Sequence, residues 1–155
     1  MRRFALAGIS LVLAACSSAP ASAPASGGSP PQTGVFVDTD RGPIALNAFS
    51  LGLAHQLPVR NHPHSVPRVR VVKAFVVNVP NVTGADAAVY WVNDPDLIFS
   101  GSQEPLESKV SDREQGGYTI STPSLGERSS GFAMLVLKSP GGGPSRYYAV
   151  ALGAS

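Results

Sequence analysis

The run Val69–Val79, VRVVKAFVVNV, is the most β-rich stretch of the chain and decides its fold class. In its first half, Arg68 and Arg70 alternate with valines, which is the two-residue period of a strand with one exposed face. In its second half nearly every position is apolar, which favours a strand that is covered on both faces or carries a bulge. The run therefore predicts a long β-strand.

Shorter runs with the same period lie on both sides of this strand. Turn sequences separate several of them, among them TDRG at 39–42 and the glycine-rich SPGGGPS at 139–145, which joins a final hairpin. Three prolines break the segment between 51 and 67, and no amphipathic helix is evident. The expected strands are Val35–Thr39, Ile44–Phe49, Val69–Val79, Ala87–Val92, Leu97–Phe99, a brief edge strand near Val110, Tyr118–Thr122, Phe132–Lys138 and Arg146–Leu152.

Seven or more short strands without helices predict an all-β domain built as an antiparallel two-sheet β-sandwich. An immunoglobulin-like sandwich is the first choice, and a transthyretin-like sandwich or a small barrel is the second. Residues 35–155 are enough for one such domain and too few for two. Trp91 and the pair Tyr147 and Tyr148 are expected in the core or at its edge.

The first residues, MRRFALAGISLVLAAC, have a different character. A basic pair precedes the apolar run Phe4–Ala15. As a helix this run would be about 18 Å long, well short of the roughly 30 Å hydrocarbon core of a bilayer. A basic start, a short apolar run and small residues at its end instead predict a signal peptide over residues 1–15.

The four residues Leu13, Ala14, Ala15 and Cys16 resemble the lipobox of bacterial lipoproteins: an aliphatic residue, two small residues and a cysteine. The resemblance implies that residues 1–15 are removed and that Cys16 carries a diacylglycerol on sulfur and an N-acyl lipid. The alternatives are an ordinary cleaved signal peptide, with Cys16 incidental, a buried core segment, and twin-arginine export, whose motif the residues RRFAL match poorly.

Residues 16–34 are then expected to be a lipidated cysteine followed by a disordered Ala/Pro/Ser/Gly tether. Residues 17–34 carry no charge and no side chain able to build a core, so they cannot offset their ordering entropy. In proteobacterial lipoproteins an aspartate after the cysteine favours inner-membrane retention. Because Ser17 lacks that signal, the resemblance favours the outer membrane, facing the periplasm, over the inner membrane or the cell surface.

The balance of acidic and basic residues limits the classes of partner that the chain is expected to bind. Loss of Arg2 and Arg3 with the signal peptide leaves ten basic and ten acidic residues, which disfavours a general nucleic-acid binder. The charges are unevenly spread, because residues 42–85 contain no Asp or Glu whereas residues 86–114 contain seven. The two stretches either pair across a sheet or form a polarised surface that orients a partner. With Cys16 lipidated, the domain has no disulfide and no cysteine-based metal site.

All three histidines, His55, His62 and His64, lie in one short stretch, HQLPVRNHPH. Imidazole is the commonest metal ligand, so a metal-binding periplasmic lipoprotein is the alternative function. A zinc site, however, needs three or four ligands with supporting partners, and an exposed basic loop accounts for the same pattern. We therefore expect no resident metal or other cofactor besides the lipid.

No motif predicts catalysis, because the chain lacks a G-x-S-x-G nucleophile elbow and no pattern places a serine beside the histidines. The first-choice function is therefore a non-enzymatic envelope lipoprotein that presents its sandwich to a protein partner. Binding would use strand addition or the oppositely charged loops 51–67 and 100–117. The residues proposed for partner binding are Arg60, Arg68, Glu104 and Glu107.

Overall fold

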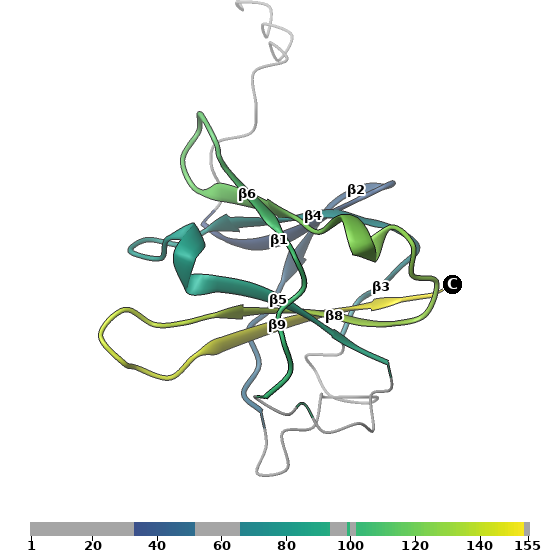
Figure 1. The fold of residues 1–155 in the computed structure, drawn as a ribbon. Helices are drawn as coiled ribbons and strands as arrows, with labels where there is room; N and C mark the ends of the chain where they lie inside the picture. Colours follow the sequence, from purple (N-terminus) through teal and green to yellow (C-terminus); the bar gives the residue numbers. More distant parts are fainter. Residues whose placement is uncertain (1–32, 52–65, 94–98, 100–101, 154–155) are drawn as a thin grey trace, which may run out of the picture.

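A computed structural model describes residues 33–51, 66–93, 99 and 102–153 of the chain. Within these ranges the protein consists of nine β-strands and two short 3-10 helices, and the strands form two sheets that pack face to face (Figure 1). The predicted all-β sandwich is confirmed. The immunoglobulin-like variant stays a prediction.

The first sheet, sheet A, has five strands in the order β2-β1-β4-β7-β6, and every neighbouring pair is antiparallel. β1 and β2 form a hairpin whose turn is closed by buried Thr39, which donates from Oγ1 to the Gly42 carbonyl at 2.7 Å. The strands are β1 (Gly34–Thr39), β2 (Gly42–Leu46), β4 (Val72–Asn78), β6 (Lys109–Asp112) and β7 (Tyr118–Ser121).

The second sheet, sheet B, has four strands in the order β3-β9-β8-β5. Its β3–β9 pair is parallel, and the other pairs are antiparallel. The predicted C-terminal hairpin is present as β8 and β9. The strands are β3 (Arg68–Val69), β5 (Ala87–Val92), β8 (Gly131–Leu137) and β9 (Arg146–Leu152).

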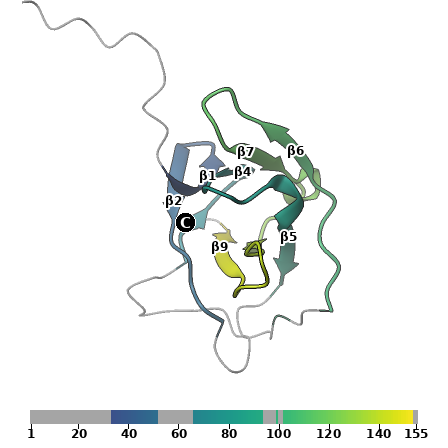
Figure 2. The ribbon, with the colours of Figure 1, turned by 90° about the vertical axis from the view of Figure 1, so that its left-hand side faces the viewer.

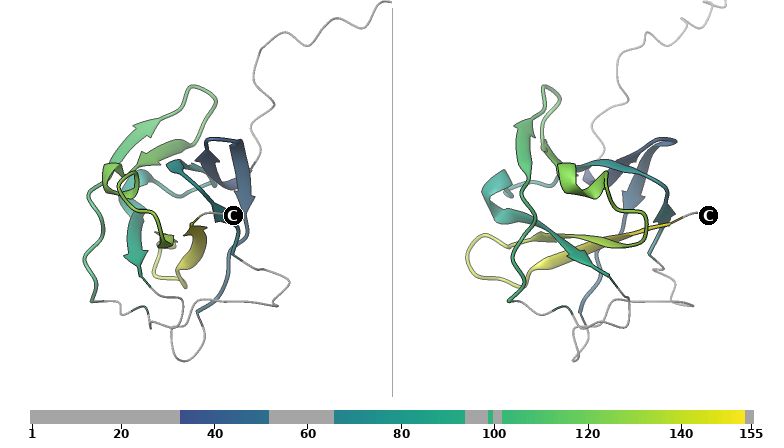
Figure 3. Two further views of the ribbon diagram at one scale, coloured as in Figure 1. Left: turned by 90° about the vertical axis from the view of Figure 1, so that its right-hand side faces the viewer. Right: turned by 45° about the vertical axis from the view of Figure 1, so that its right-hand side comes forward.

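The sandwich has two distinct ends, which Figure 2 and the left panel of Figure 3 view from opposite sides. The Gly34 end contains the start of β1, the 3-10 helix η1 (Gly84–Asp86) and the β8–β9 turn, which is tied to η1 by Lys138 N donating to Asp86 O at 2.8 Å. The Thr39 end contains the β1–β2 turn, the 3-10 helix η2 (Pro123–Leu125) and the end of β9.

The run Val69–Val79, predicted as one strand, is two strands in two sheets. β3 ends at Val69 and belongs to sheet B, whereas β4 begins at Val72 and belongs to sheet A. Val71, at the crossing, is 39% exposed. The register of the β1–β4 pair shifts between Asp38 and Thr39, and this irregularity corresponds to the bulge expected in the run.

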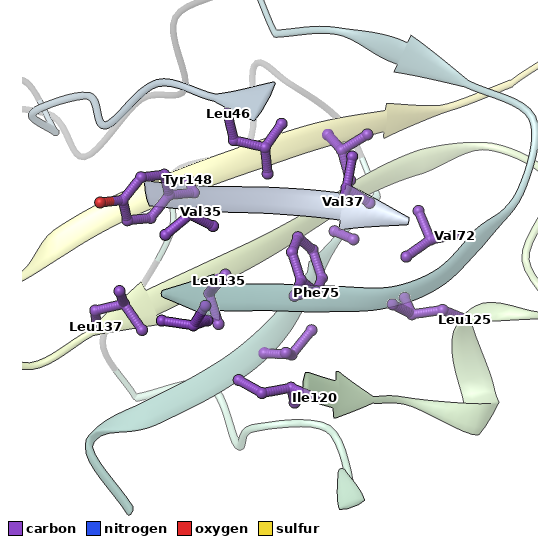
Figure 4. Packing of buried hydrophobic residues seen from close by; sticks show 14 of the residues in the cluster. Val35, Val37, Leu46, Val72, Phe75, Ile120, Leu125, Leu135, Leu137 and Tyr148 are labelled. Carbon is purple, nitrogen blue, oxygen red and sulfur yellow. The ribbon is translucent and has the colours of Figure 1, made fainter. Parts of the chain in front are cut away.

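The core between the sheets is made by alternate residues of both inner faces. Phe75 on β4 and Ile120 on β7 are almost completely buried there, with Leu135 and Tyr148 packing from sheet B (Figure 4). Leu125 of η2 belongs to the same cluster and closes it at the Thr39 end. The pattern of alternate buried residues is what antiparallel sheets with one covered face require.

Sheet B is apolar on its outer face as well. Every residue of β8 is buried, because alternate positions such as Phe132 and Met134 belong to a second hydrophobic cluster outside the inter-sheet core. Phe49 joins this cluster and donates from its N–H to the Tyr147 carbonyl at 2.9 Å. The centroids of the two rings lie 6.1 Å apart in a tilted arrangement. β8 is covered on both faces along its whole length, whereas the Val69–Val79 run is not.

Two further expectations differ from the structure at their boundaries. The strand predicted over Ile44–Phe49 ends at Leu46, and Phe49 forms an isolated bridge to the other sheet instead. Of the strand predicted over Leu97–Phe99, only Phe99 is described, and it is a buried non-strand residue whose ring packs edge-on against Tyr90.

Candidate functional site

The structure describes three of the residues that the sequence singled out. Arg68, Glu104 and Glu107 are all exposed. The remaining ones lie outside the described residues: Cys16 with the signal peptide and tether up to residue 32, His55, Arg60, His62 and His64.

Arg68 lies on β3, at one edge of sheet B. Its guanidinium extends over the end of β9, because a Cβ added to Gly153 would lie 2.8 Å from Arg68 Nη1. The extended, glycine-terminated end of β9 thus leaves room for the arginine. Arg68 is therefore part of the Thr39 end of the domain.

Glu104 and Glu107 lie on the opposite edge of sheet B. Between them, Leu106 donates its N–H to the Val89 carbonyl of β5 at 2.7 Å, and the Ser108 hydroxyl lies 2.9 Å from that of Thr122. This segment thereby bridges the two sheets. Because three strand spacings of about 4.8 Å separate β3 from β5, Arg68 and the two glutamates do not form one contiguous site.

The outer strands of sheet A differ as surfaces for strand addition. β2 carries Pro43, which has no N–H to offer an added strand. β6 is exposed at all four positions, and Val110 on it is 42% exposed. Val110 is supported from one side by Gly84 of η1, where an added Cβ would overlap the valine side chain. β6 is thus the more accessible edge.

Trp91 and Arg128 form a contact at the Thr39 end that no sequence pattern predicted. The guanidinium carbon of Arg128 lies 4.5 Å from the centroid of the Trp91 ring, within the range of a cation–π interaction. The ring itself is fixed, because it covers Gly131 so closely that a Cβ there would overlap it. Its indole N–H donates to Asn93 Oδ1.

No family model, curated protein or solved structure matches this chain.

Arg128 has unused hydrogen-bonding capacity. Its Nε is buried without a partner, and within the described part of the chain no carboxylate pairs with its guanidinium. The hydroxyl of Ser124, in the same segment between β7 and β8, is also buried without a partner. Buried polar atoms in native proteins are normally satisfied, so two such atoms in one segment mark it as unusual.

The third buried, unpartnered polar atom of the described residues is the hydroxyl of Tyr118, at the Gly34 end. Burial, and then the negative charge of Asp86, raise the pKa of Tyr118 to about 12. Hydrogen bonds from the Thr83 hydroxyl and N–H lower the pKa of the Asp86 carboxyl. Tyr118 therefore remains neutral at physiological pH and offers no base or nucleophile there.

Among the described residues, no group of three His, Cys, Asp or Glu side chains is placed to hold a metal ion. No helix in these ranges has both the length and the apolar character needed to span a bilayer.

Proposed function

We propose that this chain is a lipid-anchored protein of the bacterial cell envelope and acts as a non-enzymatic binding module for a protein partner. The sequence Leu13-Ala14-Ala15-Cys16, at the end of a short apolar run, is the observation that carries the proposal. Residues 1–15 are the signal peptide, Cys16 carries the lipid, and the outer membrane, facing the periplasm, is the favoured location.

The anchor needs more than one acyl chain to be stable. A buried methylene contributes about 0.8 kcal/mol, and one chain holds a protein only marginally at a bilayer. The diacylglycerol and N-acyl group of the lipoprotein class supply three chains. No other cofactor is part of the proposal.

The position of β1 supports a particular orientation. β1 begins at Gly34, so a tether over residues 16–34 would join the domain at its Gly34 end. The Thr39 end lies a strand of six residues away, about 20 Å at 3.4 Å per residue. The Thr39 end and the side edges, including β6, are then the surfaces turned away from the anchor and toward a partner.

The exposed β6 edge supports strand addition as the binding mode. A partner strand alongside β6 would pair with its backbone and extend sheet A from five strands to six. The oppositely charged segments 51–67 and 100–117, the second of which includes β6, are proposed to orient the partner through their charges.

Photo-crosslinking in intact cells tests the proposal. A photo-reactive residue at Lys109, on β6, is expected to capture one envelope protein, whereas the same residue at exposed Arg146, at the Gly34 end, is expected to capture none. Charge reversal at Arg60, Arg68, Glu104 and Glu107 together should weaken the capture. Capture from neither position, with the protein present at the membrane, would rule out the binding-module role.

A further inference from the structure

We infer that the Thr39 end holds a carboxylate-binding site, formed by Arg128 stacked on Trp91, that receives an acidic side chain of the partner protein. The inference deepens the proposed function. It rests on that function for the conclusion that the ligand belongs to a partner protein. The site itself does not depend on the lipid anchor.

Arg128 is held in place before any ligand arrives. Its backbone N–H donates to the Leu125 carbonyl at 3.2 Å, and its guanidinium lies over the Trp91 ring. Trp91 is fixed in turn by Gly131 and Asn93. A guanidinium stacked on an aromatic face keeps its N–H groups directed outward in its own plane, so little side-chain entropy is lost when they bind.

Among the described residues, no acceptor is paired with the guanidinium donors of this arginine. Arg128 is only partly buried, and no hydrogen bond or ion pair joins its two terminal nitrogens to another described residue. A carboxylate matches their fork geometry and accepts two parallel hydrogen bonds. The Arg128 Nε and the Ser124 hydroxyl in the same segment are buried, so the terminal nitrogens of Arg128 are the donors proposed for the ligand.

The charge of the surrounding surface favours an acidic ligand. The described residues at the Thr39 end include six basic and three acidic side chains, so the described part of this end is net positive. Such a field attracts acidic partners and raises their association rate. The basic residues are Arg41, Arg68, Arg70, Lys73, Lys109 and Arg128, and the acidic ones are Asp38, Asp40 and Glu127.

Among acidic ligands, a protein segment fits best. Trp and Arg are the residues most enriched at the energetic centres of protein interfaces. An anionic membrane is disfavoured, because the proposed tether joins the Gly34 end and turns the Thr39 end away from the anchoring bilayer. A protein that presents Glu or Asp on a loop or strand end is therefore the expected occupant.

Trp91 is the only tryptophan of the chain, so its fluorescence reports on this site alone. The full-length protein in a non-ionic detergent is titrated with a blocked tetraglutamate peptide, and a tetraglutamine peptide serves as the neutral control. We expect a saturable fluorescence change with the acidic peptide only. Arg128→Gln should weaken binding about tenfold or more, since a hydrogen-bonded charge pair is lost.

Matched variants separate binding from folding. Arg146→Gln removes an exposed arginine at the Gly34 end and should leave binding unchanged. Arg128→Lys keeps the positive charge but loses the paired N–H donors of the guanidinium, so it should bind more weakly than wild type. This variant provides the test if Arg128→Gln does not fold. Circular dichroism melting of each variant identifies any that does not fold.

Three outcomes would overturn the inference: no saturable response to tetraglutamate, equal binding by wild type and Arg128→Lys, or tighter Arg128-dependent binding of inorganic phosphate or anionic phosphatidylglycerol vesicles. If the protein carries the lipid on Cys16 but does not bind tetraglutamate, the carboxylate site is refuted and the anchor is not. If the protein binds tetraglutamate but its Cys16 is unmodified, the anchor is refuted and the carboxylate site is not.

Discussion

The Trp91 ring occupies the space that a side chain at position 131 would need. Gly131 begins β8 with a φ of 122°, a conformation that side-chain-bearing residues rarely adopt, and a Cβ there would overlap the indole. The glycine thus leaves room for the ring of the only tryptophan beside the start of β8, where Arg128 lies over that ring.

Gly131→Ala is therefore expected to destabilise the domain by about 2–4 kcal/mol, through both backbone strain and overpacking. The displaced indole should also change its fluorescence maximum in the folded state. Gly126→Ala is the matched control, because Gly126 has an ordinary helical φ of −66° and room for a Cβ. Equal urea midpoints for the two variants would contradict the packing described for Trp91.

Gly84→Ala should loosen the β6 edge. The added methyl would overlap Val110, so we expect a loss of about 1–3 kcal/mol in the free energy of unfolding. Val110→Ala in the same chain should restore much of this loss, because it removes the overlapping methyl groups. A double-mutant cycle by urea denaturation measures the coupling, and strictly additive effects would show that η1 does not support β6.

The raised pKa of Tyr118 predicts that the domain loses stability at alkaline pH. This pKa is raised from 10 to about 12, so the unfolded chain releases this proton first and stability falls as pH rises from about 10 to 12. Tyr118→Phe should remove this part of the fall and, by deleting a buried hydroxyl without a partner, stabilise the domain by about 1 kcal/mol at neutral pH.

Melting temperatures across that pH range compare Tyr118→Phe with wild type. Tyr147→Phe, at a half-buried tyrosine of the outer cluster, is the control and should keep the wild-type pH profile. An unchanged alkaline profile for Tyr118→Phe would contradict the assignment.

The histidine stretch provides a test of the alternative function. If the chain is a binding module without a metal, wild type and the His62→Ala/His64→Ala variant should take up copper or zinc equally in equilibrium dialysis. Uptake of about one ion per chain by wild type, and its loss in the variant, would instead support the metal-binding lipoprotein.

Local sequence patterns predicted strands well where an apolar run stays within one sheet. Ala87–Val92 and Arg146–Leu152 occupy the ranges that their apolar periods indicated, and the glycine-rich turn joins the last two strands as expected. Alternation alone cannot show where a chain leaves one sheet for another. The division of Val69–Val79 at Val71 was therefore not predicted, because Val71 has the same β-propensity as its neighbours.

The candidate site was less predictable for a related reason. Trp91 and Arg128 meet because β5 pairs with β8 in a register that places Trp91 opposite Ala133, two residues after Gly131. Arg128 lies in an ordinary polar stretch, GERSSG, and its role depends on that long-range pairing. The glycine before the wholly apolar run Phe132–Leu137 is the one local signal of a close approach.

Mass spectrometry of the mature protein's N-terminal peptide, isolated from membranes, tests the central proposal most directly. The account predicts a chain that begins at Cys16 and carries the mass of a diacylglycerol and an N-acyl group, and a Cys16→Ser variant that is neither lipidated nor retained at the membrane. A wild-type peptide with an unmodified Cys16 thiol, or one that retains residues 1–15, would contradict it.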